Sequence, residues 1–235
     1  MAVESSEPIS NRLIEGLPRK ERHRVLTCGE LVELDFGTTL CEPDQRYRHV
    51  YFPLTGFISL VAEVRGHQPL EIGMIGNEGM LGASLALGLE AAPLRGVVQG
   101  SGSALRMTVP HLRRELDDSP RLLRTLNRYL YVFMVQLSQT IVCTRFHEVE
   151  ERLVRWLLLT HDRAHADHFH LTHQFLADML GVRRSAVTIA AGSLQKRGLI
   201  RYARGKINVL SRKGLEAASC ECYDAVVDDY TRLLI

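Results

Sequence analysis

The chain has 235 residues, of which 46% are hydrophobic, and its 29 Lys and Arg residues nearly balance its 27 Asp and Glu residues. This composition can build a buried core and excludes an intrinsically disordered chain, while the length fits two ordinary domains. The longest stretch without charged side chains, between Arg128 and Arg145, contains polar residues such as Gln136, so we expect no membrane span. Residues 1–18 lack an apolar block and predict no secretory signal, so we expect a cytoplasmic protein.

Charge is distributed unevenly along the chain. Between His168 and Gly214, nine basic residues accompany the single acid Asp178, so this segment carries a charge of +8 and the remainder −6. A protein that neutralises nucleic-acid phosphates releases condensed counterions and gains affinity. The asymmetry favours a phosphate-binding module joined to a separate body, and a solvated basic face without a partner is the alternative.

Cysteine is present in an odd number without a CxxC pair. The five residues are Cys28, Cys41, Cys143, Cys220 and Cys222. Such a scattered set is typical neither of a disulfide framework nor of a thiolate zinc site. We therefore expect free thiols, and we predict no metal and no other cofactor.

The N-terminal half predicts a short helix followed by a β domain. Residues 8–27 have an amphipathic helical pattern that Pro18 interrupts. From about residue 29 to residue 110, short β-rich runs alternate with turn residues, which is typical of an all-β sandwich or barrel. These runs are Leu31–Phe36, His49–Phe52, Phe57–Val64 and Leu105–Val109. The Gly- and Ala-rich insert Gly76–Leu89 leaves room for a short helix.

A long helix of roughly 25 residues is predicted to begin near Ser119–Pro120. Its apolar residues alternate in steps of three and four and form one stripe of Leu123, Leu126, Leu130, Phe133, Leu137 and Ile141. We interpret the stripe as the seam of a homodimer, while flanking residues such as Tyr129, Val132 and Val135 cover the β domain. Packing of the stripe on the β domain is the alternative. A second helix, Glu148–Arg163, follows a hinge at residues 145–147.

Residues 171–200 contain two short helical patterns joined at Gly181. Thr172 is suited to cap the first helix and Gly198 to end the second. A tight turn with Gly between two such helices is typical of a helix-turn-helix, whose second helix enters the major groove. The turn Ala203–Lys206 then separates two short β runs. The segment therefore predicts a winged helix-turn-helix with a basic wing tip.

These features resemble the Crp/Fnr transcription regulators from about Asn11 to the end, most specifically over Leu171–Leu210. The resemblance implies an α+β protein with three parts: a cyclic-nucleotide-binding-like β-roll sensor of jelly-roll (double-stranded β-helix) type, a long dimerisation helix with a hinge, and a winged helix-turn-helix. We expect these parts at residues 1–118, 119–147 and 148–235. The expected partners are double-stranded DNA, a second copy of the chain and, for an activator, RNA polymerase.

Predicted DNA contacts follow from the resemblance and from the docking geometry of the motif. Base contacts are assigned to Arg183, Arg184, Ser185 and Thr188, and phosphate contacts to Thr172, Lys196, Arg204 and Lys206. Arg184 is suited to the O6 and N7 atoms of guanine. The family typically has Glu after this Arg and a polar or basic residue one turn later, whereas this chain has Ser185 and Ile189. The usual half-site is therefore not expected.

The predicted effector pocket is assigned to Gly82, Ala83, Arg95 and Gly96. The family's cyclic-nucleotide site uses a Gly-Glu pair and an Arg-Ser/Thr pair, and here Ala83 lacks the carboxylate and Gly96 the hydroxyl. The phosphate and ribose would be incompletely matched, so we do not expect cyclic AMP. The alternative is a regulator that responds to a cyclic nucleotide or another small anion through Arg95. Arg95 could instead form an ion pair with Glu78 or Glu90.

Other members of the family sense with an iron–sulfur cluster or a haem. The N-terminal half has only Cys28 and Cys41, thirteen positions apart, so an iron–sulfur cluster is not expected. Haem stays open because one His or Cys can ligate it, although no residue demands it. A histidine run consists of His161, His165, His168, His170 and His173. We interpret it as a solvated linker, with a zinc or nickel site as the alternative.

Two further classes of function compete with DNA binding. A β-barrel enzyme of cupin type with an accessory helical domain needs a close HxH pair, yet the β region has only His49 and His67, with His111 just beyond. P-loop and nucleophile-elbow motifs are also missing, so we expect no enzyme. A nucleotide-binding module that acts only through proteins is disfavoured by the +8 segment. The acidic segment Glu216–Asp229 either packs as a helix on the DNA module or faces a partner.

Overall fold

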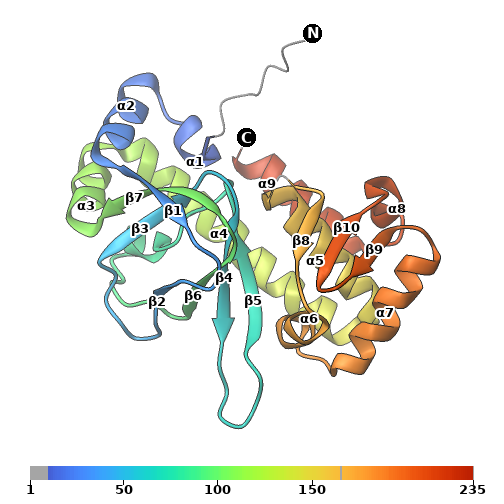
Figure 1. Ribbon diagram of the computed structural model, residues 1–235. Coiled ribbons are helices and arrows are strands. Elements are labelled where there is room, and N and C mark those ends of the chain that lie inside the picture. Colours follow the sequence, from blue (N-terminus) through green and yellow to red (C-terminus); the bar gives the residue numbers. More distant parts are fainter. Residues whose placement is uncertain (1–9, 165, 235) are drawn as a thin grey trace.

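The computed structural model describes residues 10–164 and 166–234, and contains a β-rich N-terminal domain, a long helix and a C-terminal domain (Figure 1). The chain begins with two helices, α1 (Arg12–Glu15) and α2 (Arg19–Cys28), rather than one interrupted helix. They are separate because proline fixes φ and lacks an N–H, so Pro18 begins α2 instead of continuing α1. Asn11 caps α1 and also donates to the carbonyls of Pro53 and Gly79, which ties the helix to the β domain.

Two antiparallel sheets form the N-terminal domain, in the strand orders β1-β7-β3 and β2-β6-β4-β5. The strands are β1 (Glu30–Leu34), β2 (Thr39–Cys41), β3 (His49–Pro53), β4 (Phe57–Ala62), β5 (Leu70–Ile75), β6 (Arg95–Gly100) and β7 (Gly102–Thr108). The expected β domain is therefore present. A short 3-10 helix, η1 (Ala83–Leu87), occupies the insert where a short helix was expected.

Three strands, β2, β5 and β6, were not predicted from the sequence. Glycines in β5 and β6 resemble loop residues in the sequence, but the fold requires small residues there. A Cβ at Gly100 would lie 2.4 Å from Cδ1 of Phe57, and one at Gly96 would lie 2.9 Å from Sγ of Cys41. These glycines therefore occur where the sheet is closely packed, not at turns.

The long helix α4 (Pro120–Phe146) follows α3 (Val109–Asp118) and runs from the β domain to the C-terminal domain (Figure 1). Ser119 caps it by accepting a hydrogen bond from the N–H of Leu122, so the predicted start is correct. The helix has 27 residues. No helix among the described residues is long and apolar enough to cross a membrane.

The C-terminal domain combines five helices and one small sheet of order β8-β10-β9. Its elements are α5 (Val149–Ala164), β8 (His168–His170), α6 (His173–Leu180), α7 (Arg184–Lys196), β9 (Ile200–Ala203), β10 (Lys206–Val209), α8 (Arg212–Glu216) and α9 (Glu221–Leu234). Strand β8 corrects the interpretation of the histidine run as a linker, because part of that run pairs with β10.

The acidic C-terminal segment becomes α9, which packs mainly on α4. Its buried face consists of Cys222, Tyr223, Val226 and Tyr230. The acids point away from this face, as expected for an amphipathic helix. Of the two alternatives, packing as a helix therefore holds, but the long helix rather than the DNA module is its main support.

Buried polar contacts join the β domain to α5. Arg163 on α5 forms an ion pair of 2.7 Å with Glu78 and donates to Oε1 of Gln136 on α4 at 3.1 Å. Trp156 on α5 donates from Nε1 to a carboxylate oxygen of Glu71 on β5 at 2.8 Å. These contacts hold the C-terminal domain against the β domain.

Candidate nucleic-acid interface

Helices α6 and α7 form the predicted helix-turn-helix. Thr172 accepts a hydrogen bond from the N–H of Phe175 at 3.1 Å and so caps α6. Gly181 ends that helix with φ 62°, and Gly198 follows α7 with φ 68°. Both values lie in the left-handed region that glycine adopts without strain, so local sequence is sufficient to set both helix ends.

The two helices share a core with α5, and this core determines which face of α7 is free. The buried residues of α6 and α7 are Leu176, Ala177, Met179, Leu180, Val187, Ala190, Ala191 and Leu194. Because these side chains occupy one side of α7, the opposite side is presented to solvent. That free side carries the predicted base contacts.

Arg183, Arg184 and Ser185 are exposed at the N-terminus of α7. The positive end of a helix dipole and its free N–H groups lie at the same place, which favours an anionic partner. Thr188 is also exposed, but its hydroxyl already donates to the carbonyl of Arg184 at 3.1 Å and lies 2.9 Å from Nδ1 of His173. Thr188 is therefore less free to contact a base than Arg183, Arg184 and Ser185.

His173, on α6, contacts both α7 and the wing. Its ring stacks on Tyr202 of β9 with a centroid distance of 4.2 Å. Burial and the nearby charge of Arg184 lower the pKa of His173. A lowered pKa favours the neutral imidazole, which adds no positive charge beside the cationic end of α7.

The wing is a two-stranded hairpin whose loop consists of Arg204 and Gly205, with φ values of 50° and 76°. Two successive positive φ values are typical of the tight turns that join antiparallel strands. The N–H of Leu171 donates to the carbonyl of Gly205 at 2.7 Å, which places the wing tip beside Thr172. Arg204, Lys206 and Thr172, three of the predicted phosphate contacts, therefore belong to one exposed region.

Lys196 and Ile189 extend the free face of α7. Ser185, Ile189 and Lys196 recur at helical spacing, and all three are exposed. Ile189 is 75% exposed although it is a large apolar residue. No contact was predicted for Ile189 from the sequence, but its position one turn after Ser185 on the predicted recognition helix was a signal for one.

Only part of the predicted dimer seam is exposed and free to contact a second copy of the chain. Leu126 is fully buried within its own chain, so its assignment to the seam is wrong. Phe133 and Leu137 contact β5, because a Cβ at Gly73 would lie 3.0 Å from each of them. Ile141 remains 70% exposed. Tyr129 and Val132 are buried on the β-domain side, as the sequence analysis assigned them.

The apolar residues of α4 that face solvent share only Ile141 with the predicted seam. The large exposed apolar residues of the helix are Tyr131, Met134, Ile141, Val142 and Phe146. Helical spacing places Tyr131, Met134 and Ile141 on one face. The hydrophobic period and the side of α4 that faces the β domain were therefore predicted correctly, whereas Leu126 belongs to the buried side of the helix.

Around the predicted effector pocket, Arg95 forms an ion pair with Glu63 at 2.7 Å. The expected pairing with Glu78 or Glu90 is wrong, since Glu78 pairs with Arg163 and Glu90 with arginines elsewhere. The sequence could not distinguish these acids, because Glu63 approaches Arg95 only through the pairing of β4 with β6.

The remaining pocket residues are closely packed. Gly82 has φ 92°, and a Cβ there would lie 2.7 Å from Cγ1 of Val50. Ala83 is buried. A Cβ at Gly96 would lie 3.3 Å from Leu81 as well as close to Cys41. Side chains of the β domain therefore fill the space beside these residues.

The histidine run does not converge on one point among the described residues. Nε2 of His161 lies 2.7 Å from Oδ1 of Asp167, and its Nδ1 accepts a hydrogen bond from Arg212 at 2.8 Å. His168 and His170 are exposed on β8. His165, the partner that spacing suggested for His161, lies outside the described residues.

Comparisons with known proteins agree with this geometry. The family described as the Crp-like helix-turn-helix domain matches residues 151–218. A search of curated proteins finds no match to the chain.

Solved structures resemble nearly the whole chain at low sequence identity. FixK2 from Bradyrhizobium japonicum is 16% identical with a TM-score of 0.66, covering 82% of this chain and 98% of its own. The c-di-GMP-responsive global regulator CLP from Xanthomonas campestris is 17% identical with a TM-score of 0.66, covering 83% and 100%. A Crp/Fnr-family transcriptional regulator from Thermus thermophilus is 21% identical with a TM-score of 0.61, covering 81% and 98%.

At these identities the structural matches establish the fold, and the family match establishes the DNA-binding domain. The expected order of a β domain, a long helix and a winged helix-turn-helix is confirmed. The chain thus has the fold of the Crp/Fnr regulators and carries their Crp-like helix-turn-helix domain at residues 151–218.

Proposed function

We propose that the chain is a homodimeric, sequence-specific DNA-binding transcription regulator of the Crp/Fnr type. The observation that carries this proposal concerns the basic residues on the free face of α7 and the wing, and whether they have ion-pair partners. Among the described residues, no ion pair involves Arg183, Arg184, Lys196, Arg204 or Lys206, whereas Arg197 pairs with Glu150 and Arg212 with Asp162. Cations without an internal partner on the face of a recognition helix are suited to phosphates and bases.

In this proposal the face of α7 reads the major groove. Arg184 contacts the O6 and N7 atoms of a guanine, and Arg183 and Ser185 contact a neighbouring base or phosphate. Ile189, exposed one turn further on, is suited to the methyl group of thymine. Thr172, Lys196, Arg204 and Lys206 hold the backbone on either side, which fixes the register of α7 in the groove.

Operator selection with the purified full chain tests the proposal. We expect the chain to enrich one sequence from random duplexes, and Arg184→Ala to lose that preference while retaining weak general binding. Arg197→Ala is the matched control, because Arg197 ends the same helix but is paired with Glu150; it should keep the preference. Failure of the wild-type chain to enrich any sequence, or an unchanged preference in Arg184→Ala, would contradict the proposal.

The exposed stripe of α4 is the proposed dimer contact. Two copies of Tyr131, Met134 and Ile141 would cover each other and bury apolar surface that one chain leaves in water. We expect Ile141→Glu to be monomeric by light scattering. Val64→Glu, at an equally exposed apolar residue in the β domain, should remain dimeric. A monomeric wild-type chain, or a dimeric Ile141→Glu variant, would show that this stripe is not the contact.

The proposal assigns residues 1–118 to sensing, 119–147 to dimerisation and 148–235 to DNA binding, with the signal unidentified. We do not propose that the chain binds cyclic AMP in the family's usual mode, because Ala83 and Gly96 lack the family's polar groups and Arg95 is paired with Glu63. Calorimetric titration with cyclic AMP should give no heat beyond dilution. Saturation at micromolar concentrations would contradict this point.

A further inference from the structure

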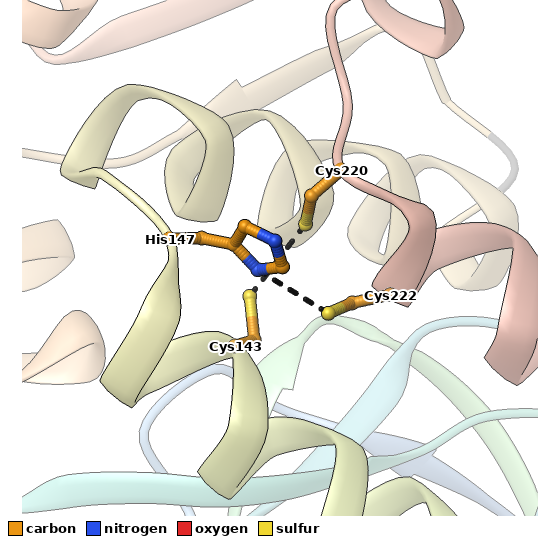
Figure 2. A group of neighbouring side chains, drawn as sticks. All are labelled: Cys143, His147, Cys220 and Cys222. Carbon is orange, nitrogen blue, oxygen red and sulfur yellow. Dashed lines mark hydrogen bonds between the residues drawn. The ribbon is translucent and has the colours of Figure 1, made fainter.

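Four potential metal ligands meet where the end of α4 lies against the start of α9 (Figure 2). They are Cys143, His147, Cys220 and Cys222, and their donor atoms all lie within 4.8 Å of one another. The three cysteines form a buried cluster, and the His147 side chain is only 14% exposed. Three of the five cysteines, which are scattered in the sequence, are therefore neighbours in the fold.

Local structure holds each pair of ligands. Cys143 and His147 are one turn apart at the end of α4, where the N–H of His147 donates to the carbonyl of Cys143 at 3.1 Å. Cys220 and Cys222 lie at the start of α9, where the N–H of Tyr223 donates to the carbonyl of Cys220 at 3.1 Å. Further along α9, Val226 and Tyr230 are buried. Core packing of α9, rather than contact between the thiols, therefore brings the two pairs together.

Two of the six distances between donor atoms are those of a tetrahedral zinc site. Sγ of Cys143 lies 3.7 Å from Sγ of Cys220, and Sγ of Cys222 lies 3.4 Å from Nδ1 of His147. A zinc ion with Zn–S bonds of about 2.3 Å and a Zn–N bond of about 2.0 Å has tetrahedral edges of about 3.8 Å between sulfurs and about 3.5 Å between sulfur and nitrogen. All five cysteines are free thiols. These two edges therefore match those of a single zinc ion, and all four donor atoms lie within 4.8 Å of one another.

The other nitrogen of His147 has a carboxylate beside it. Nε2 of His147 lies 3.4 Å from Oε2 of Glu221, while Nδ1 faces the sulfurs. Metal-bound histidines almost always direct their second ring nitrogen to a carboxylate, a carbonyl or water, which sets the tautomer and the ring orientation. Glu221 supplies such a partner from between the two cysteine ligands of α9.

We propose that Cys143, His147, Cys220 and Cys222 bind one zinc ion in a closed structural site. Three cysteines and one histidine complete the tetrahedron and leave no open position for substrate, which is typical of structural rather than catalytic zinc. An iron–sulfur cluster of several irons would spread the thiolates over different iron atoms, farther apart than the edges of a single-ion tetrahedron. Binding displaces the thiol protons of the three cysteines to solvent and involves no electron transfer.

The position of the site gives it a consequence for the rest of the molecule. It joins the C-terminal end of α4 to α9, directly before α5 leads into the helix-turn-helix. The predicted hinge at residues 145–147 is shorter in the structure, because Arg145 and Phe146 belong to α4. A bound ion would restrain His147 and Glu148, which connect α4 to α5 and so to the DNA-binding domain. We expect zinc to stabilise the folded chain, because the unfolded chain holds these ligands apart.

Metal analysis of the full chain, purified under reducing conditions and dialysed after zinc addition, tests the proposal. We expect about one zinc ion per chain by plasma mass spectrometry for the wild type. Cys222→Ser should retain far less zinc after the dialysis, because a thiolate ligand is removed. Cys41→Ser, which changes a buried cysteine of the β domain, should keep it. A wild type without zinc, or equal zinc in Cys222→Ser, would overturn the proposal.

Cobalt substitution of the wild type does not depend on whether a variant folds. Titration of the metal-free chain with Co²⁺ should give the intense visible bands of tetrahedral cobalt with thiolate ligands and saturate at one equivalent. Weak bands of octahedral cobalt, or iron–sulfur absorption in chain purified without oxygen, would overturn the proposal. Circular dichroism of Cys222→Ser without metal should match that of the metal-free wild type, which distinguishes loss of a ligand from loss of the fold.

Discussion

The contact between the β domain and α5 and the free face of α7 both depend on arginines, but the arginines have different partners. In the buried contact, the Arg163 guanidinium is paired with Glu78 and hydrogen-bonded to Gln136. On α7, Arg183 and Arg184 are exposed and take part in none of the ion pairs formed by the described residues. A buried charge is costly unless its own chain supplies a partner, whereas an exposed charge is solvated until a partner arrives. The difference separates cations that hold the protein together from cations available to DNA.

The largest effect is expected at the buried ion pair. Glu78→Gln would leave Arg163 buried without a counter-charge and should lower the free energy of unfolding by about 3–5 kcal/mol. Glu30→Gln is the control, because Glu30 forms a largely exposed pair with Arg106 and should cost less than about 1 kcal/mol. Urea unfolding measures both. Equal losses would show that burial does not distinguish the two pairs.

A second buried acid, Glu71, lies in the same contact. Burial raises the pKa of Glu71 to about 7, against the hydrogen bonds from Ser59 and Trp156 and the charges of Arg163 and Arg155, which lower it. Oγ of Ser59 lies 2.5 Å from a carboxylate oxygen of Glu71 and 2.9 Å from Oε1 of Gln99. One hydroxyl hydrogen cannot serve two acceptors. The hydrogen bond from Ser59 to the ionised Glu71 therefore competes with the one from Ser59 to Gln99.

This geometry predicts a pH dependence of stability. Because the pKa of Glu71 is raised in the folded chain from 4.5 to about 7, the folded chain binds an extra proton between these pH values. Protonation of Glu71 stabilises the folded chain fully below about pH 4.5. This stabilisation, on the order of 3 kcal/mol, is lost as the pH rises through 7. Glu71→Gln keeps the neutral form and should flatten this dependence. Unfolding midpoints at pH 5 and pH 8 for both chains measure it; identical slopes would contradict the prediction.

A smaller effect is expected at Ile189, which tests whether exposure on α7 reflects function rather than folding. Ile189→Ala removes a methyl contact to thymine and should weaken binding by about 1 kcal/mol when the selected operator has thymine at one position. The unfolding free energy should be almost unchanged, because Ile189 is 75% exposed. Binding to operators changed at single positions measures the first quantity. A loss spread evenly over all sequences would contradict the assignment.

The smallest effect is expected at the wing. Lys206→Ala should weaken binding to all sequences alike and reduce the slope of log affinity against log salt by about one unit, because one phosphate contact is lost. Fluorescence anisotropy over a range of salt concentrations measures the slope. A loss confined to the selected operator would indicate a base contact instead.

Local features were predictable because each depends on a few neighbouring residues. Thr172 caps α6, Gly181 and Gly198 end helices, and Arg204–Gly205 forms a tight hairpin, all as expected. The start of α4 at Pro120 was also correct. Caps and tight turns are decided by hydrogen bonds and dihedral preferences within about four residues, so a single sequence is sufficient for them.

Contacts across the fold required the coordinates. The sequence showed an apolar period in α4 and placed Ile141 outward, but it did not show that Leu126 faces inward, because the packing of the whole core decides this. It showed two acids as partners for Arg95 but not Glu63. It also showed Cys143 and Cys220 as 77 positions apart. Only the packing of α9 on α4 makes them neighbours, since distances between remote residues depend on the whole core rather than on local preference.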